Sequence, residues 1–385
     1  MLFRSLALRL AGTLAPALAL SVSLAGCGPD GSAASRVEEW AVVDDPRVSI
    51  GRLDGSEEEL FQSIADAVVT PSGSIVVADR GLAAIRVFDA EGRFAAELGR
   101  RGEGPGEFSY LMSVDFFPPD SILAWDGATA RLTYFGVDGS LMGTVDLRAG
   151  MAAAGIPSLD QYVGRFPDGS LGFTTIRVGP EVGDPDRMTL ERFSMDGVHL
   201  GRVAEMSGMV RGRRAPNPYS PFPYFAASGE GLYFTSGAGP TVSSLSTGGT
   251  EGKIALPPRH GDVDEAWDAL PDAVDSLAPP IFRQFLPEAE KPDSLPHYAG
   301  LLVDARGRIW TKPFSAPEDA LWIQAGGRVR GGAWMVADAE GDPVADVTLP
   351  VDFIPLVVLS DRVLGIRVSE LGVERIQVLP ILVVE

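Results

Sequence analysis

A motif that recurs after 47 residues is the feature that most constrains the fold of this chain. Five residue types return in the same order at that spacing: Pro71, Ile75, Asp79, Phe88 and Gly92, then Pro118, Ile122, Asp126, Phe135 and Gly139. Each copy holds short apolar runs separated by Asp- and Gly-containing turns, a pattern typical of β-hairpins. Because one blade of a β-propeller takes about 40 to 50 residues, the spacing predicts a propeller.

Further units can be traced along the chain, although the third, fourth and sixth depart visibly from the repeat. Six units fit between Trp40 and Glu385. Each reads as a four-stranded antiparallel sheet, so the predicted fold class is an all-β, six-bladed β-propeller. Residues 321–323 are predicted to form a strand of the fifth unit, and no useful helical period is expected within the units.

Apolar runs lie at both ends of the predicted ring, at 40–43 and 381–384. We expect them to share one blade, because an open ring would leave two unpaired sheet edges. Pairing of one of these runs elsewhere is the alternative.

The N-terminal segment has the composition of an export signal. Arg4 and Arg9 precede a short apolar stretch that contains a proline and ends in small residues, which predicts a signal peptide over 1–26 rather than a spanning helix. Leu-Ala-Gly then precedes Cys27, the single cysteine of the chain. This resembles the lipobox of bacterial lipoproteins, which implies that Cys27 becomes the lipidated first residue. A stray cysteine in an ordinary signal peptide is the alternative.

Residues 27–39 have the composition of a flexible tether, and 40–385 are predicted to form the propeller as one domain. In the lipoprotein family an Asp after the cysteine tends to retain a protein at the inner membrane. Gly28 stands there instead, so the resemblance favours the outer membrane. The net charge is −20, and removal of a signal with two arginines and no acid leaves −22. A field of that sign disfavours nucleic acid and anionic lipid surfaces as partners.

Residues 257–296 fit no blade and are predicted to be an insertion between the fourth and fifth units. Within it, 262–270 reads as a short helix that has an acidic first turn and stops before Pro271. Residues 272–277 could add another turn, and the later prolines indicate an extended covering loop. A loop of this length is usually functional or mobile.

Two consecutive stretches carry a family resemblance. IVVADRGLAAIRVFDAEGRF and the following LGRRGEGPGEF resemble the NHL-type repeats of bacterial six-bladed β-propeller lipoproteins. The resemblance implies the fold and export but leaves the activity open. The glycine-rich segment 99–108 lacks the Gly-Lys-Ser/Thr ending of a phosphate loop, so it is predicted to link two blades, with Phe108 anchoring the second.

The strongest candidate binding segment is rich in arginine and aromatic residues. Three arginines and several aromatics in one loop of an acidic protein suit carboxylates, sugars or a peptide. The alternative is that the arginines pair with neighbouring acids and the aromatics plug the ring. With a tryptophan of the insertion as a partial lid, the candidate ligand-binding residues are Arg211, Arg213, Arg214, Tyr219, Tyr224 and Trp267.

An enzymatic alternative is metal-assisted hydrolysis, since gluconolactonase-like propellers hold a divalent cation in the central channel. Asp79, Asp126 and Asp304, which stand at matched positions of their blades, are the candidate ligands, for a cation such as calcium. Against this, an Asp at a turn-prone position commonly caps its own backbone. The three histidines are dispersed along the chain, which disfavours a histidine-ligated metal.

The sequence therefore favours an exported, lipid-anchored propeller without a cofactor. Its expected role is noncatalytic binding of a peptide, a glycan or an envelope protein. A metal-dependent, lactonase-like hydrolase or lyase with its site in the central channel is the alternative. Convergence of three or more oxygen ligands on the ring axis would favour the enzyme.

Overall fold

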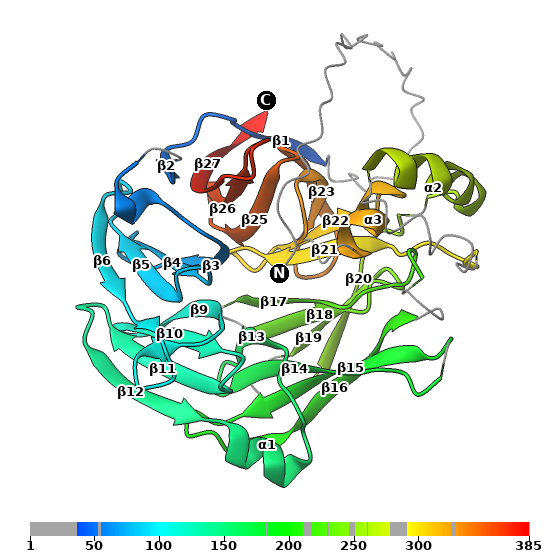
Figure 1. The fold of residues 1–385 in the computed structure, drawn as a ribbon. Helices are drawn as coiled ribbons and strands as arrows, with labels where there is room; N and C mark the ends of the chain where they lie inside the picture. Colours follow the sequence, from blue (N-terminus) through cyan, green and yellow to red (C-terminus); the bar gives the residue numbers. More distant parts are fainter. Residues whose placement is uncertain are drawn as a thin grey trace.

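The computed structural model describes residues 37–52, 55–181, 183–210, 217–228, 231–245, 251–259, 261–277, 291–324 and 328–384. The predicted signal peptide, Cys27 and most of the tether lie outside these residues. Within them, the strands form a ring of six blades (Figure 1), which confirms the predicted fold class. Strand β1 begins at Glu38, two residues before the predicted start of the domain.

The first three blades are regular four-stranded antiparallel sheets whose first strand lies nearest the ring centre (Figure 1). Blade 1 contains β3 (Ile64–Val69), β4 (Ile75–Asp79), β5 (Ala84–Phe88) and β6 (Phe94–Leu98). Blade 2 contains β9 (Leu111–Phe117), β10 (Ser121–Asp126), β11 (Arg131–Gly136) and β12 (Leu141–Asp146). Blade 3 contains β13 (Gln161–Arg165), β14 (Leu171–Arg177), β15 (Pro185–Phe193) and β16 (His199–Val210).

Blades 4 and 5 follow the same order. Blade 4 contains β17 (Tyr224–Ser228), β18 (Gly231–Thr235), β19 (Thr241–Leu245) and β20 (Glu251–Ala255). Blade 5 contains β21 (Tyr298–Val303), β22 (Ile309–Pro313), β23 (Gly332–Ala337) and β24 (Pro343–Leu349). Blade 6 contains β25 (Phe353–Val358), β26 (Arg362–Val368) and β27 (Glu374–Val384).

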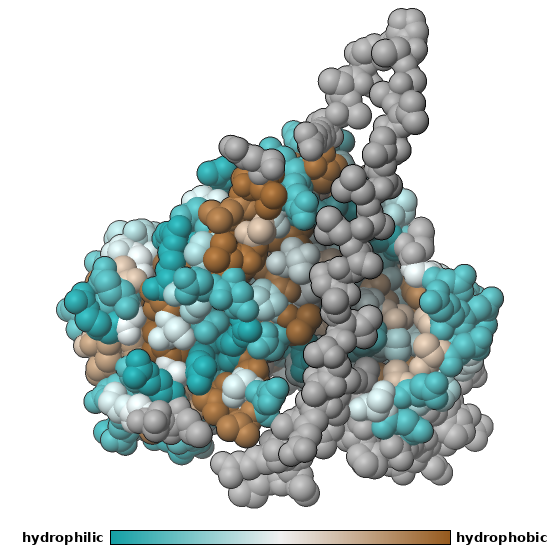
Figure 2. Space-filling model, turned by 90° about the horizontal axis from the view of Figure 1, so that it is seen from above, coloured by the Kyte–Doolittle hydropathy of each residue, from teal (hydrophilic) through white to brown (hydrophobic). Residues whose placement is uncertain are grey.

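The two ends of the chain close the ring. The start of β27 pairs antiparallel with β2 (Val48–Ile50), and its end pairs with β1 (Glu38–Val42), with Trp40 opposite Val383. Strand β1 also pairs in parallel with β24 of blade 5. The expectation that strands from both termini share a blade is therefore confirmed. Figure 2 views the molecule from the side on which β1 and β27 lie, where apolar residues gather between polar ones.

Because neighbouring strands run in opposite directions, the loops divide between two faces. Links between blades and turns between second and third strands lie on one face, which we call the linker face. The remaining turns lie on the other, the hairpin face. The described chain begins at Val37 and ends at Val384 on the hairpin face, whereas the insertion and the arginine-aromatic loop are links.

Apolar clusters between neighbouring blades form the core. The repeated residues belong to it: Ile75 and Phe88 pack between blades 6 and 1, and Ile122 and Phe135 between blades 1 and 2. Each of these four side chains is at most 3% exposed. The apolar residues of the 47-residue repeat are thus the ones whose side chains pack between neighbouring blades.

Three α-helices are described, and all lie on the linker face: α1 (Arg148–Ala154), α2 (Val263–Leu277) and α3 (Glu318–Gln324). The expectation of no helix within the units was wrong for α3, which contains the predicted strand 321–323. The predicted stop before Pro271 was also wrong, because α2 continues to Leu277. Leu270 and Val274 lie on either side of the proline, and their burial offsets the lost backbone hydrogen bond.

Within the described residues, no helix is long and apolar enough to span a membrane.

The glycine-rich link behaves as predicted. Its short strands β7 (Arg100–Arg101) and β8 (Glu107–Phe108) pair in parallel, and Phe108 is fully buried between blades 1 and 2.

Candidate functional site

The repeated aspartates Asp79 and Asp126 hold backbone amides. Each is fully buried at the end of the second strand of its blade. The Asp126 carboxylate accepts hydrogen bonds from the amides of Ser109 at 2.6 Å, Tyr110 at 3.0 Å and Thr129 at 3.0 Å. Each carboxylate thereby joins the incoming blade link to the turn that follows its own strand.

Asp79 does the same in blade 1, where it accepts from Gln62 at 2.9 Å, Ser63 at 3.1 Å and Leu82 at 3.2 Å. The sequence assigned Asp304 to the same blade position, but the structure places it elsewhere. It follows β21 and accepts from the amides of Arg306 and Arg308 and from the indole of Trp310.

The three aspartates named as alternative metal ligands are thus committed to separate polar contacts in blades 1, 2 and 5. Among the described residues, no three His, Cys, Asp or Glu side chains form a group suited to a metal ion. An enzymatic reading of this protein has to rest on other side chains.

The arginine-aromatic loop is only partly described, since Arg211, Arg213 and Arg214 lie outside the described residues. Tyr219 is 1% exposed, and its hydroxyl donates to the carbonyl of Ala266 in α2 at 2.7 Å. Its ring lies 6.4 Å from that of Trp267. The loop and the insertion therefore meet on one face, but Tyr219 packs beneath the helix instead of facing an opening.

Tyr224 begins the inner strand of blade 4, and its hydroxyl is buried. Burial, together with the neighbouring Asp319 carboxylate, raises the Tyr224 pKa well above its usual value. Asp319 belongs to α3 and accepts from the Lys312 ammonium at 2.6 Å and from the Ser315 amide at 2.8 Å. This buried ion pair fastens α3 to blade 5 next to Tyr224.

A different polar group, which sequence reasoning missed, lies on the inner strands around the ring centre. Two carboxylates, a phenol and two guanidinium groups come from blades 1, 2 and 3 and from the segment that precedes β23. We call it the axial cluster, and its members are Asp66, Asp115, Tyr162, Arg165 and Arg328.

Asp66 connects blade 1 with blade 2, and Arg328 connects blade 1 with blade 5. The Asp66 carboxylate accepts from the amide of Val114 in blade 2 at 3.2 Å. Arg328 donates to the carbonyl of Ile64 at 3.1 Å and also to that of Ala65. Although it precedes β23 of blade 5, its guanidinium therefore reaches the inner strand of blade 1.

Asp115, Tyr162 and Arg165 form the second half of the axial cluster. The Tyr162 hydroxyl donates to Asp115 at 2.7 Å, and the Arg165 guanidinium lies 3.8 Å from the same carboxylate and 4.6 Å from the ring centre of Phe117. The side chains of Asp115 and Arg165 are 27% and 30% exposed. A bound molecule can therefore reach this ion pair.

Burial controls the electrostatics of the axial cluster. It raises the Asp66 pKa from 3.8 to about 7, against the opposing effect of the Arg328 charge and with a smaller contribution from Asp115. Burial also raises the pKa of Asp115, although the Tyr162 hydrogen bond and Arg165 oppose it. Clustered groups with perturbed pKa values are a feature of functional sites.

A weak sequence signal for this cluster was available. Asp66 interrupts the apolar run of β3, and Asp115 interrupts that of β9. A charged residue within an inner strand is unusual, because such strands are largely buried.

The raised Asp66 pKa predicts a pH-dependent stability. The folded protein retains this proton between about pH 4 and pH 7, whereas the unfolded chain releases it, so the contribution of Asp66 to stability should fall as the pH rises through that range. Asp66→Asn should abolish a decrease on the order of 3 kcal/mol, measured by urea unfolding at pH 5 and pH 8. Asp138→Asn, at an exposed turn, is the control, and parallel profiles for Asp66→Asn and the wild type would contradict the prediction.

The comparisons with known proteins agree on the fold. Residues 48–163 match the model of a protein family described as a 6-bladed beta-propeller. No curated protein matches this chain.

Two solved structures resemble the whole domain. A member of the duf4221 family from Bacteroides vulgatus is 9% identical with a TM-score of 0.54, over 90% of this chain and 99% of that one. A protein from Bacteroides fragilis named "Putative exported protein" is 11% identical with a TM-score of 0.50, over 92% of this chain and 98% of that one. At these identities the likeness shows the fold alone.

Proposed function

We propose that this protein is an envelope-anchored propeller lipoprotein that binds a peptide, a glycan or a protein partner without chemical conversion. The observation that carries the proposal is the reachable Asp115–Arg165 ion pair within the axial cluster. Acidic and basic groups held side by side present both acceptors and donors, which suits a polar ligand bearing groups of both kinds. Of the three ligand classes, a peptide fits this arrangement of donors and acceptors best.

The linker face offers an entrance to the ring centre beside Tyr110, and the Asp115–Arg165 pair lies farther in, toward the hairpin end of the inner strands. Arg80 follows β4, and its guanidinium lies 4.9 Å from the ring centre of Tyr110 and donates to the backbone carbonyl of Leu111 at 3.3 Å. Tyr110 is 44% exposed, so an aromatic surface is available beside the inner strands. Aromatic and guanidinium groups together favour recognition of peptides and sugars.

The point where the predicted tether joins the propeller agrees with an anchored binding protein. Val37 lies on the hairpin face, so a lipid at Cys27 would turn the linker face away from the membrane. The signal-like segment that precedes Cys27 supports export of this chain as well.

A hydrolase or lyase activity remains the second candidate because of Asp66. A carboxyl group with a pKa of about 7 is suited to general acid–base chemistry at neutral pH. Recovery of a bound peptide unchanged, after incubation with calcium and also with a chelator, would support the noncatalytic assignment.

Acylation of Cys27 is the first testable part of the proposal. Cys27→Ser should move the protein from the detergent-rich to the aqueous phase in detergent partitioning, since the acyl chain supplies the membrane affinity. Ser35→Ala, in the same tether, is the matched control. Unchanged partitioning of Cys27→Ser would contradict acylation.

Site-specific photocrosslinking in cells tests the binding face. A photoreactive residue in place of Tyr110 should yield adducts with peptides or proteins, whereas the same residue in place of Val137, exposed on the hairpin face, should yield few. Arg165→Gln should reduce the Tyr110 adducts about tenfold, because it removes an ion-pairing group. Thermal unfolding confirms that each variant is folded, and equal adduct yields at both positions would exclude the linker face as the binding surface.

A further inference from the structure

We infer a second binding site, on the hairpin face between blades 6 and 1, that takes an amphiphilic anion: a carboxylate or phosphate head joined to a short apolar group. It lies on the opposite face from the linker-face entrance and shares no residue with the axial cluster. The inference is therefore independent of the function proposed for that cluster.

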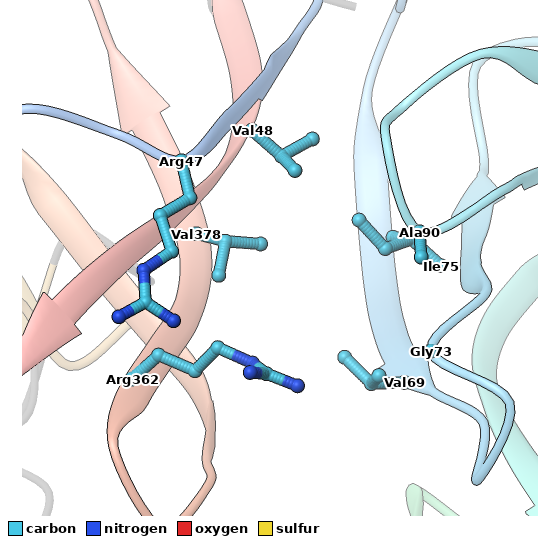
Figure 3. Close-up of a pocket in the computed structure, with 8 residues that line it drawn as sticks. All are labelled: Arg47, Val48, Val69, Gly73, Ile75, Ala90, Arg362 and Val378. Atoms are coloured by element: carbon cyan, nitrogen blue, oxygen red, sulfur yellow. The ribbon is translucent and has the colours of Figure 1, made fainter.

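The site is a pocket at the seam where the ring closes. The N-terminal segment and blade 6 form one wall, and the first hairpins of blade 1 form the other (Figure 3). Its lining residues are Arg47, Val48, Val69, Gly73, Ile75, Ala90, Arg362 and Val378.

The interior of the pocket is apolar. Ile75 and Val378 are 2% and 6% exposed and belong to the cluster that joins blades 6 and 1, with Val48 and Val69 packed against it. The pocket volume is about 160 Å³. An apolar cavity of ~150 Å³ accepts benzene, so this one has room for about six carbon atoms.

Two guanidinium groups lie at the polar end of the pocket. In Figure 3 the Arg362 guanidinium points across the opening toward Val69, and that of Arg47 points toward Arg362. Arg47 lies 3.1 Å from one oxygen of Asp361, and Arg362 lies 3.4 Å from the other. Two cations therefore share one anion, which leaves one positive charge in a strongly acidic protein.

Both guanidinium groups keep donors available for a ligand. Arg47 and Arg362 are 50% and 36% exposed. Among the described residues, Asp361 is the side-chain partner of each. Guanidinium groups bind carboxylate and phosphate oxygens through paired hydrogen bonds, and the adjacent valines exclude water from the attached apolar group.

The apolar interior and the two guanidinium groups together select the ligand class. A simple anion would leave the apolar walls in contact with water, and an apolar molecule would leave the excess positive charge without a partner. A ligand with both parts satisfies both ends of the pocket. Such a molecule could come from free solution or from the lipids of a membrane, and the two sources share this chemistry.

Calorimetric titration of the full chain with linear carboxylates from acetate to octanoate tests the site. Affinity should rise about fourfold for each added methylene and level off near six carbons, where the pocket is filled. Octylammonium, which has the same tail and the opposite charge, should bind at least tenfold more weakly than octanoate. Equal binding of octanoate and octylammonium would overturn the inference.

Variants locate the binding. Arg47→Gln combined with Arg362→Gln should weaken octanoate at least tenfold, whereas Arg93→Gln, an exposed arginine on the same face, should leave it unchanged. Ala90→Leu, which fills the pocket from blade 1, should weaken octanoate while both arginines remain. Full octanoate affinity in folded forms of the double variant and of Ala90→Leu would refute the site.

Vesicles distinguish the two ligand sources. If membrane lipid occupies the pocket, the Cys27→Ser protein should sediment with phosphatidylglycerol vesicles but not with phosphatidylcholine vesicles, and the double arginine variant should not sediment. Octanoate binding without sedimentation supports the site and assigns it to a free amphiphile.

Discussion

Replacing Asp126 by alanine should lower the free energy of unfolding by about 3 kcal/mol or more, measured by urea denaturation. The carboxylate is fully buried and accepts three backbone hydrogen bonds, so its removal leaves three amides without their acceptor. Each unsatisfied buried donor costs about 1–3 kcal/mol. Asp79→Ala should have a similar effect, because Asp79 holds the matching contacts in blade 1.

Two further variants sharpen this experiment. Asp138 accepts from the amide of Ser140 at an exposed turn, so Asp138→Ala should cost less than about 1 kcal/mol. If Asp126→Ala does not fold, Asp126→Asn keeps one acceptor oxygen and should show an intermediate loss. Equal stability of Asp126→Ala and Asp138→Ala would show that the repeated aspartate has no structural role.

Removal of residues 381–385 should lower the free energy of unfolding by roughly 4 kcal/mol or more. The truncation deletes the partner of β1 in blade 6 and uncovers Trp40, which is 6% exposed and packs 5.9 Å from Trp310. A large aromatic side chain buries roughly 150–250 Å², and each Å² contributes about 25 cal/mol. The urea midpoint should decrease accordingly.

A surface variant distinguishes the effect of ring closure on stability from the effect of losing an exposed apolar side chain. Val383 is 57% exposed, so Val383→Thr should change stability by less than about 1 kcal/mol while the strand stays paired. If the truncation left the midpoint unchanged, closure by β27 and β1 would contribute nothing, and the parallel pairing of β1 with β24 alone would hold the N-terminal strand.

The aspartates show why the chemistry of a site is harder to derive than the fold around it. A turn-prone Asp in a repeat can be a metal ligand or a backbone cap, and the sequence is the same in both cases. Only the distances from Asp79 and Asp126 to the amides around them identify the cap. Asp304, which looked equivalent from the sequence, lies at a different turn. The repeat is only partly retained in its unit, so the repeat pattern alone does not establish which positions correspond between units.

The blades can be derived from the amino-acid sequence alone. Spacing of apolar residues and turn glycines is a local property, and the same packing contact recurs in each blade, so the pattern could be found without coordinates. Closure by the two termini followed from the need to pair sheet edges. Helix α3 could not be found in this way, because its seven residues are too few to show a helical period and their burial depends on α2.

Which polar residues meet depends on the three-dimensional arrangement of the blades. Asp66, Asp115, Tyr162, Arg165 and Arg328 span more than 260 positions of the chain, and the ring brings them to its centre. Likewise, Arg47 and Arg362 lie 315 positions apart and share one carboxylate because the ring closes at that seam. Such contacts depend on long-range strand pairing, whereas the sequence pattern encodes which residues each blade buries.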